Sequence, residues 1–324
     1  MNFIKSCILS TEKKEEEEIP QLPVESPDVK ESGFKHLFEI QRISKKQLYD
    51  RNPEFVAKYA EEKLKQFTLV VCGAPKTGKS TLINAICGKA VADTSDSLDA
   101  LTTDTKCYPV EGAYPVIEEE QDYQKKFRIN IYDTKGITSW DLSIIDILKS
   151  TNPICMIYCA TPGTFADLRM VEELIKECVR LKIFVALVCT NMWTNDDEHR
   201  ETIMQEFDNV LKVHSKDCKR ENGVSYYGDI ALTMMINSLP FKDPDLGVYK
   251  PKEGINRLVY GIMKSLGEDK LLGWCFTVME NEGFWSQMQT QIQGFFADQF
   301  SYGTSILWSW VGPKMRWLKE HGLN

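Results

Sequence analysis

Short apolar runs alternate with stretches of helical periodicity between residues 68 and 267. The apolar runs have the length and composition of buried strands, and the periodic stretches place apolar residues on one face of a helix. Such alternation is typical of a mostly parallel sheet that helices cover on both faces. The sequence therefore predicts a doubly wound α/β fold with a mostly parallel six-stranded sheet. The expected strands are 68–72, 107–111, 128–132, 154–159, 183–190 and 230–237, and the expected helices are 80–87, 139–149, 165–181, 197–213 and 254–266. The polar stretch 118–126 is expected to connect the second and third strands as a hairpin.

Both ends of the chain depart from this pattern. Residues 1–33 contain four consecutive glutamates and three prolines, so we expect a disordered acidic tail there. Residues 34–66 carry apolar groups at helical spacing and are expected to form a helical lead-in. The central domain then spans 67–267, and a helical extension spans 268–324.

The extension is rich in aromatic residues and holds five of the seven tryptophans. Aromatic rings beside Lys314, Arg316 and Lys319 suit a membrane interface, so peripheral membrane contact through 284–319 is one interpretation. Packing of these rings on the central domain or on a second subunit is the alternative that we favour. Polar residues such as Asp298 interrupt the apolar surface and disfavour a membrane span.

Charge and cysteine usage narrow the class of protein. The net charge of −8 argues against a general nucleic-acid binder, whose surface would be basic. The ten cysteines lack metal-ligand spacing, and several lie in apolar runs, as expected for buried thiols of a cytosolic protein. The start of the chain lacks the long apolar region of a signal peptide, and no run of 18 uncharged apolar residues occurs. We therefore expect a cytoplasmic protein that is membrane-associated only if the extension binds a surface.

The strongest chemical signal is Gly73-Ala-Pro-Lys-Thr-Gly-Lys-Ser80, which lies between a predicted strand and a predicted helix. Glycines let the backbone wrap around an anion with its N–H groups pointing inward. Lys79 is placed to reach the β- and γ-phosphate oxygens, and the Ser80 hydroxyl is placed to coordinate Mg²⁺. The run is a complete phosphate-binding loop, and it predicts a bound nucleoside triphosphate. The predicted contacts are Gly73, Ala74, Pro75, Lys76, Thr77, Gly78, Lys79, Ser80 and Thr81.

A second anchor is Asp133-Thr-Lys-Gly136 at the end of the third predicted strand. Asp133 is placed to support Mg²⁺ through water, and the Gly136 N–H is placed to sense the γ-phosphate. Between the two anchors, Thr102 and Thr103 offer a hydroxyl that could complete the metal shell when a loop closes, and Thr103 is our first choice. Ordinary turn and loop chemistry remains the alternative for each threonine.

These motifs resemble the first three motifs of the TRAFAC-class GTPases, in the branch with Era-like, septin-like and immunity-associated members. The resemblance covers 68–267 and implies GTP or GDP as ligand with Mg²⁺ as cofactor. It gives Lys79, Thr103 and Gly136 catalytic roles, and Ser80, Thr103 and Asp133 metal-binding roles. It also places the base near Thr190, Asn191, Asn237 and Ser238, because Met235-Ile-Asn237-Ser238 stands where the family's fifth motif packs against the base.

The fourth motif of the family departs from its pattern. Where the family has Asn/Thr-Lys-x-Asp, this chain has Thr190-Asn-Met-Trp193. The family's aspartate accepts two hydrogen bonds from guanine, so its loss weakens guanine selectivity. Trp193 could stack on a base, although a lid or core position is the interpretation that we favour, and Asp196 or Asp197 could substitute for the aspartate. GTP stays favoured over ATP by the remaining motifs.

Two residues bear on hydrolysis. Ile137 follows Gly136, where Ras-like enzymes hold a water-positioning glutamine, and an alkyl group cannot orient water. Lys76 could supply charge near the phosphates, although a solvated loop lysine is the interpretation that we favour. The sequence therefore predicts a GTP-binding switch with slow intrinsic hydrolysis, whose nucleotide state controls assembly or association with a partner or membrane.

The alternative is a non-hydrolysing nucleotide-binding scaffold without strict guanine specificity, and a metabolic P-loop kinase is a distant third. The partners expected from the resemblance are a second copy of the chain through the nucleotide face and an unidentified protein effector.

Overall fold

The computed structural model describes residues 65–94, 104–118, 121–136, 143–162, 168–194, 197–245 and 247–299. The predicted acidic tail and most of the predicted lead-in lie outside these residues. Lys65 and Gln66, which we assigned to the lead-in, instead begin the first strand.

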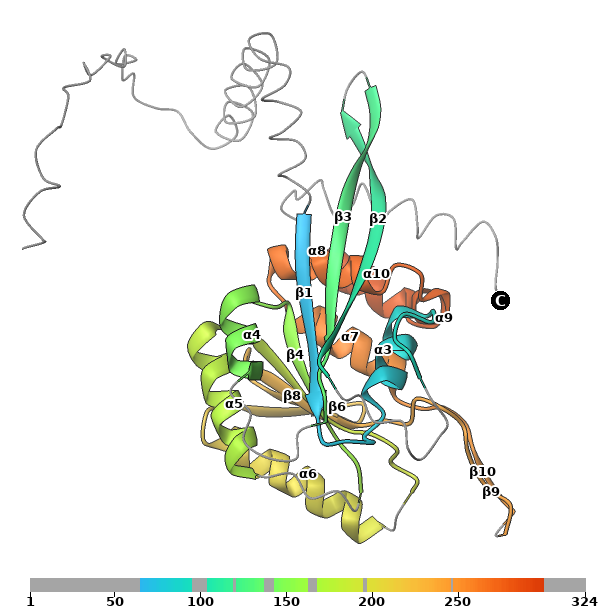
Figure 1. Ribbon diagram of the computed structural model, residues 1–324. Coiled ribbons are helices and arrows are strands. Elements are labelled where there is room, and N and C mark those ends of the chain that lie inside the picture. Colours follow the sequence, from blue (N-terminus) through green and yellow to red (C-terminus); the bar gives the residue numbers. More distant parts are fainter. Residues whose placement is uncertain are drawn as a thin grey trace, which may run out of the picture. The chain divides into compact units, whose positions relative to one another are not determined.

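An eight-stranded sheet forms the centre of the fold (Figure 1), in the order β2-β3-β1-β4-β5-β8-β7-β6. Strands β3, β1, β4, β5 and β8 run parallel, whereas β2 and the β6–β7 pair are antiparallel to their neighbours. This arrangement confirms the doubly wound, mostly parallel α/β fold. The strands are β1 (Lys65–Gly73), β2 (Lys106–Glu118), β3 (Gln121–Asp133), β4 (Cys155–Ala160), β5 (Phe184–Cys189), β6 (Cys218–Glu221), β7 (Val224–Tyr227) and β8 (Ala231–Met235).

All six predicted strands are present, and the hairpin β6–β7 raises the strand count to eight. The stretch 118–126, predicted to be a connection, is largely strand, because β2 and β3 each continue for 13 residues. A separate two-stranded sheet pairs β9 (Phe241–Asp243) with β10 (Val248–Lys250).

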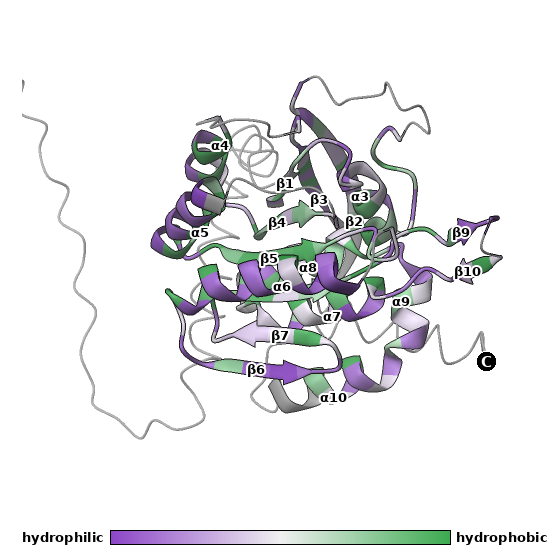
Figure 2. Ribbon diagram, turned by 90° about the horizontal axis from the view of Figure 1, so that it is seen from below, coloured by the Kyte–Doolittle hydropathy of each residue, from purple (hydrophilic) through white to green (hydrophobic). Residues whose placement is uncertain are grey.

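Helices cover both faces of the main sheet. One face carries α4 (Ser143–Thr151), α5 (Leu168–Leu181) and α6 (Asp197–Lys212), and its core includes Val70 and Cys72 of β1. The other face carries α3 (Lys79–Cys87), α7 (Ile255–Ser265), α8 (Glu268–Thr277), α9 (Glu282–Gln287) and α10 (Gln289–Gln299). Its core includes Leu69 and Val71. Alternate residues of β1 thus pack into the cores on opposite faces of the sheet, because successive side chains of a strand point to opposite sides. Figure 2 shows apolar colour concentrated on the inner strands β4 and β5.

The described part of the extension packs against the sheet. Trp274, Phe284, Trp285 and Phe296 are buried in the same core as Leu69, and the rings of Phe276 and Phe127 of β3 stack 4.1 Å apart. Packing on the central domain therefore accounts for these rings. Among the described helices, none combines the length and apolar character needed to cross a membrane. Residues 300–324, with the remaining tryptophans of the extension, lie outside the described part.

Candidate functional site

The phosphate loop begins where β1 ends at Gly73, whose φ is +138°. A side chain at this position would collide with the backbone carbonyl of Cys159 in the neighbouring strand β4, so only glycine lets the loop leave the sheet here. Gly78, with φ +75°, then turns the chain into α3. The predicted strand, loop and helix are therefore all present, and the first residues of α3 line the cavity.

Lys79 lies across the loop that precedes it. Its ammonium donates hydrogen bonds to the carbonyl oxygens of Ala74 at 2.9 Å and Gly73 at 3.3 Å. The Thr77 hydroxyl donates to the same Ala74 oxygen at 2.9 Å and is fully buried. Thr77 is thus an internal brace of the loop, whereas Lys79 lines the cavity together with Lys76, which is exposed.

Ser80 and Asp133 meet at the base of the loop. The Ser80 hydroxyl donates a hydrogen bond to Oδ2 of Asp133. Burial raises the pKa of the Asp133 carboxyl, although the Ser80 hydroxyl and the Lys79 ammonium oppose this effect. The second carboxylate oxygen, Oδ1, is buried and has no hydrogen-bond partner among the described residues.

This pair of oxygen-bearing side chains fits a hard divalent cation. Hydroxyl and carboxylate oxygens are the ligand types that Mg²⁺ prefers, and the unpartnered Oδ1 leaves acceptor capacity for a metal-bound water. Thr103, the third predicted ligand, lies outside the described residues, as does Ile137.

Gly136 lies directly against the phosphate loop. An added Cβ would come within 2.5 Å of the Cα of Pro75 and 2.6 Å of its nitrogen. The Thr134 N–H also donates to the Val71 carbonyl of β1 at 3.1 Å. Asp133-Thr-Lys-Gly136 is therefore packed on the phosphate loop.

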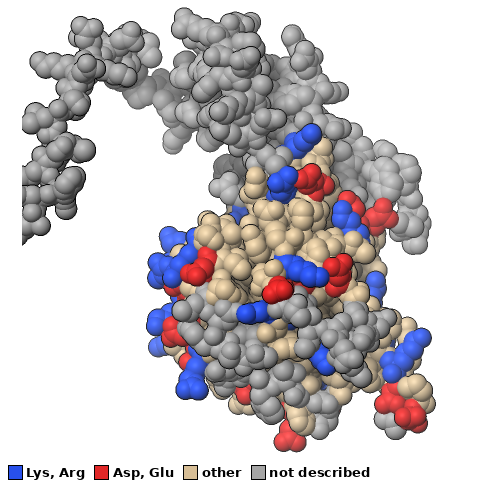
Figure 3. Space-filling view, in the orientation of Figure 1, with Lys and Arg blue, Asp and Glu red and all other residues tan. Residues whose placement is uncertain are grey.

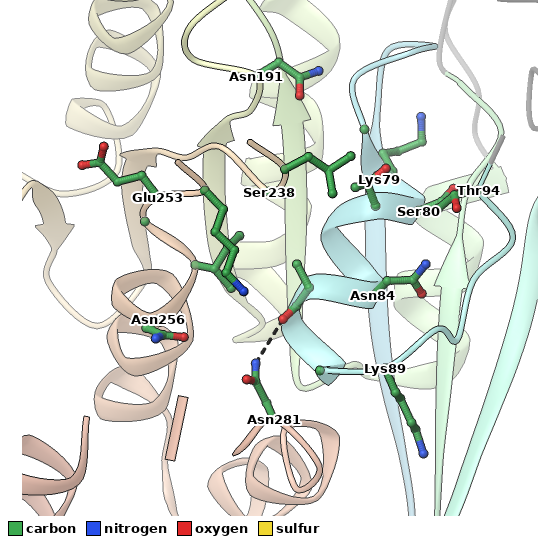
Figure 4. Close-up of a pocket in the computed structure, with 18 of the residues that line it drawn as sticks. Lys79, Ser80, Asn84, Lys89, Thr94, Asn191, Ser238, Glu253, Asn256 and Asn281 are labelled. Atoms are coloured by element: carbon green, nitrogen blue, oxygen red, sulfur yellow. Dashed lines mark hydrogen bonds between the residues drawn. The ribbon is translucent and has the colours of Figure 1, made fainter. Parts of the chain in front are cut away.

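The fourth motif has a structural role at its first residue. The Thr190 hydroxyl is buried and lies 2.6 Å from the Thr77 carbonyl oxygen and 2.9 Å from that of Ala160. It therefore ties the end of β5 to the phosphate loop and does not line the cavity. Asn191, at φ +49°, does line the cavity, and its amide is next to Gly78 (Figure 4).

In the fifth motif, too, one residue has a structural role and the other lines the cavity. The Asn237 side chain donates to the Leu239 carbonyl, and its backbone forms a two-way bridge with Glu253 at 2.8 Å. Asn237 shapes the turn but does not line the cavity, whereas Ser238 does. Asn191 and Ser238 are thus the two predicted base-side residues that reach the cavity.

Trp193 is absent from the cavity lining. The Arg200 guanidinium is 5.3 Å from its ring centroid, and the Lys250 ammonium of β10 is 5.2 Å from it. Arg200 also donates to the Met192 carbonyl at 2.9 Å. These cation–π contacts fix the indole outside the cavity and support the non-base interpretation.

The cavity has a volume of about 1920 Å³ and extends well beyond the loop. It continues along α3 to the start of α7 and to the turn before α9, where Asn281 faces α3 (Figure 4). No local motif in the sequence marks these residues, so we did not predict that they line the cavity. Its lining residues include Asn256, Arg257, Glu280, Asn281, Glu282 and Gln287.

Part of the chain matches a family model and a curated protein. Residues 68–216 match the family model described as "50S ribosome-binding GTPase". Cell division control protein 11 of Saccharomyces cerevisiae is 38% identical over 71 residues, which is 22% of this chain and 17% of the yeast protein.

The comparison with solved structures includes Toc33 from Arabidopsis thaliana, with 20% identity and a TM-score of 0.37 over 65% of this chain and 88% of that chain. Era from Aquifex aeolicus shows 20% identity and a TM-score of 0.38 over 63% of this chain and 58% of that chain. A bacterial selenocysteine-specific elongation factor shows 16% identity and a TM-score of 0.39 over 63% of this chain and 30% of that chain.

The matched segment contains Lys79, Ser80, Asp133 and Gly136 in one cluster at the carboxyl ends of β1 and β3. Residues 68–216 therefore resemble the G domain of P-loop GTPases in both sequence and phosphate-loop structure.

Proposed function

We propose that this protein binds GTP with Mg²⁺ and acts as a slowly hydrolysing switch. The observation that carries the proposal is the cluster of the Lys79 ammonium, the Ser80–Asp133 pair and Gly136 packed on Pro75. In such a site the backbone N–H groups at the start of α3 and the Lys79 ammonium would bind the phosphates. Ser80 and Asp133 would hold Mg²⁺, whose charge would neutralise the phosphate oxygens, and Thr103 is proposed as the third metal-binding residue.

Fewer residues support the identity of the base than support phosphate and Mg²⁺ binding. Asn191 and Ser238 line the cavity beside Gly78, and the Asn191 amide offers both a donor and an acceptor to a base edge. The family match favours guanine, whereas the missing aspartate of the fourth motif reduces its advantage over adenine. We therefore propose GTP as the ligand with moderate discrimination against ATP.

The slow hydrolysis follows from Ile137, which offers no group to orient a water molecule. The same residue favours the alternative function, a nucleotide-binding scaffold that does not hydrolyse its ligand. Phosphate release from GTP by the purified protein, with and without Mg²⁺, separates the two. We expect turnover that is slow and that disappears in Asp133→Asn. Release no faster than that of the variant would favour the scaffold.

The nucleotide state would control association through the loops around Thr103 and after Gly136. A homodimer through the nucleotide face and a protein effector are the proposed partners. Lys/Arg and Asp/Glu side chains are interspersed on the face shown in Figure 3, and no nucleic-acid partner is proposed.

We predicted peripheral membrane contact through 284–319, and we now propose it only for the residues after 299. Phe284, Trp285 and Phe296 are buried and are not available to a membrane surface. Flotation of the full chain with liposomes of anionic lipid, compared with a chain ending at residue 299, tests this remaining part. Equal flotation of the two chains would remove it.

A further inference from the structure

Helix α3 follows the phosphate loop, and its C-terminal end is held by a side chain from a distant part of the chain. It is nine residues long, whereas isolated helices shorter than about 12 residues are marginal in water. Its N-cap is Gly78, which offers no side chain, and its first turn has no acidic residue to offset the helix dipole. Tertiary contacts therefore fix this helix: Leu82, Ile83 and Ile86 are buried in the core, and its C-terminal end has a partner outside the helix.

The C-terminus of α3 is held by Asn281, 195 residues further along the chain. The Asn281 amide nitrogen donates to the carbonyl oxygens of Ile86 at 2.9 Å and Ala85 at 3.0 Å (Figure 4). These are two of the four carbonyls that an α-helix leaves without a partner at its end. The amide oxygen of Asn281 accepts from the Phe284 N–H at 3.1 Å and caps α9. One planar amide thus joins the ends of two helices.

The backbones around this contact fit closely. Gly88 ends α3 with φ +71°, and an added Cβ would lie 2.5 Å from the Asn281 Cα. Lys89 and Glu280 form an ion pair at 2.8 Å across the same junction. The Trp285 indole donates to the Val278 carbonyl at 2.8 Å and ties the turn before α9 to the core. The turn is therefore a fixed support for α3.

The same turn borders the nucleotide cleft. Glu280, Asn281 and Glu282 line the cavity that Ser80 and Thr81 line from the other end of α3. The extension thus completes one wall of the cleft, which residues 68–216 alone do not supply.

We propose that Asn281 is a positioning residue for the nucleotide site. It holds the C-terminal end of the helix whose N-terminal end binds phosphate, so the two contacts stabilise the same arrangement of α3. This inference rests on the proposed triphosphate binding. Because coupling between two sites is reciprocal, the Asn281 contact raises nucleotide affinity, and bound nucleotide strengthens the Asn281 contact.

Asn281→Ser tests the link to α3 separately from the cap of α9. Serine is a good N-cap for α9 but carries no amide to donate to Ala85 and Ile86. Asn281→Asp also keeps the cap and places acceptor oxygens against the two carbonyls. The matched control is Tyr260→Phe, which removes a hydrogen bond from α7 to the Gln291 carbonyl of α10 at 3.2 Å and keeps the two hydrogen bonds from Asn281 to α3.

The readouts are calorimetric affinities for GTP and GDP with Mg²⁺ and hydrogen exchange with and without nucleotide. We expect Asn281→Ser to weaken binding about fivefold or more, Asn281→Asp to weaken it further, and Tyr260→Phe to bind like wild type. Nucleotide should slow amide exchange at 282–287 in the wild type and lose this effect in Asn281→Ser. If Asn281 only stabilised the fold, nucleotide binding at the phosphate loop would not slow amide exchange in α9.

Unchanged affinity together with unchanged transfer of protection in Asn281→Ser would overturn the inference. If the wild type binds no nucleotide, the proposed function fails independently of Asn281. The support of α3 by Asn281 is then tested separately: we expect faster exchange of the α3 amides in nucleotide-free Asn281→Ser than in Tyr260→Phe, and equal exchange would contradict that support.

Discussion

Two glycines of the phosphate site are required because another backbone passes too close for a side chain. Gly73 lies against the carbonyl of Cys159, and Gly136 lies against Pro75. The first contact joins the loop to strand β4, and the second joins it to the segment after β3. The two glycines therefore let three parts of the chain converge on one anion-binding loop.

Gly136→Ala is expected to reduce nucleotide affinity strongly. Its Cβ would have to displace the backbone of Pro75 and weaken hydrogen bonds from the loop to the charged phosphates, so we expect a loss of about tenfold or more. Titration of GTP with Mg²⁺ measures the effect. The control is Gly294→Ala, in an exposed part of α10 with open space around it, where alanine should keep affinity and add about 0.5 to 1 kcal/mol of stability. Wild-type affinity in Gly136→Ala would show that the loop does not depend on this contact.

The motifs predict some site residues and cannot predict others. Lys79, Ser80 and Asp133 follow from spacing, because phosphate and metal chemistry require those side chains near a strand end. The roles of Thr190 and Asn281 depend on hydrogen bonds to backbone carbonyls 113 and 195 residues away. Every residue has a backbone carbonyl, so the sequence does not show which carbonyl accepts a hydrogen bond from a distant side chain. These two roles are therefore found only in the folded structure.

At the scale of elements, periodicity located the long strands and helices but missed the hairpin β6–β7. Its strands have four residues each and few buried positions, so they show little alternation. The signal that could have found it is Asn222-Gly223, a pair that favours the two-residue turn of a hairpin. Both residues have positive φ, +51° and +77°, as that turn requires.

The hairpin is joined to α7 by an ion pair with a pH-dependent contribution to stability. The hydrogen bond from Lys264 at 2.9 Å holds the pKa of the Glu221 carboxyl below its ordinary value of 4.5. A depressed pKa means that the pair stabilises the fold above about pH 4.5 and loses its effect as the pH falls further.

Glu221→Gln should therefore destabilise the protein at pH 7 by at most about 0.5 kcal/mol, because both side chains are partly exposed. The difference from wild type should shrink below pH 4.5. Urea unfolding at several pH values measures it, and Glu172→Gln on the exposed face of α5 is the control. A difference that grows on acidification would contradict this assignment.

Removing the extension should unfold the central domain instead of releasing it. Helices α8 to α10 bury Trp274, Phe276 and Trp285 in the same core as β1 and β3. A chain ending at Gly267 would expose that core face, and the loss of even one such aromatic side chain costs about 3 to 5 kcal/mol. Circular dichroism and gel filtration measure the outcome. A soluble, cooperatively folding chain ending at Gly267 would show that the extension is dispensable.

For the whole molecule, one cleft connects the phosphate loop to the C-terminal helices. The sheet brings Ser80 and Asp133 together near the ends of β1 and β3, and Asn281 of the extension donates hydrogen bonds to the C-terminal end of α3. Nucleotide binding and packing of the extension therefore act on the same short helix. The account as a whole depends on the identity of the ligand in that cleft.

The most direct test is calorimetric titration of the nucleotide-free full chain with GTP and with ATP, each with Mg²⁺ and with EDTA. We predict that GTP binds more tightly than ATP, and that chelation of Mg²⁺ weakens GTP binding at least about tenfold, because Ser80 and Asp133 hold the metal. No heat of binding for either nucleotide, or equal affinities that Mg²⁺ does not change, would contradict the account.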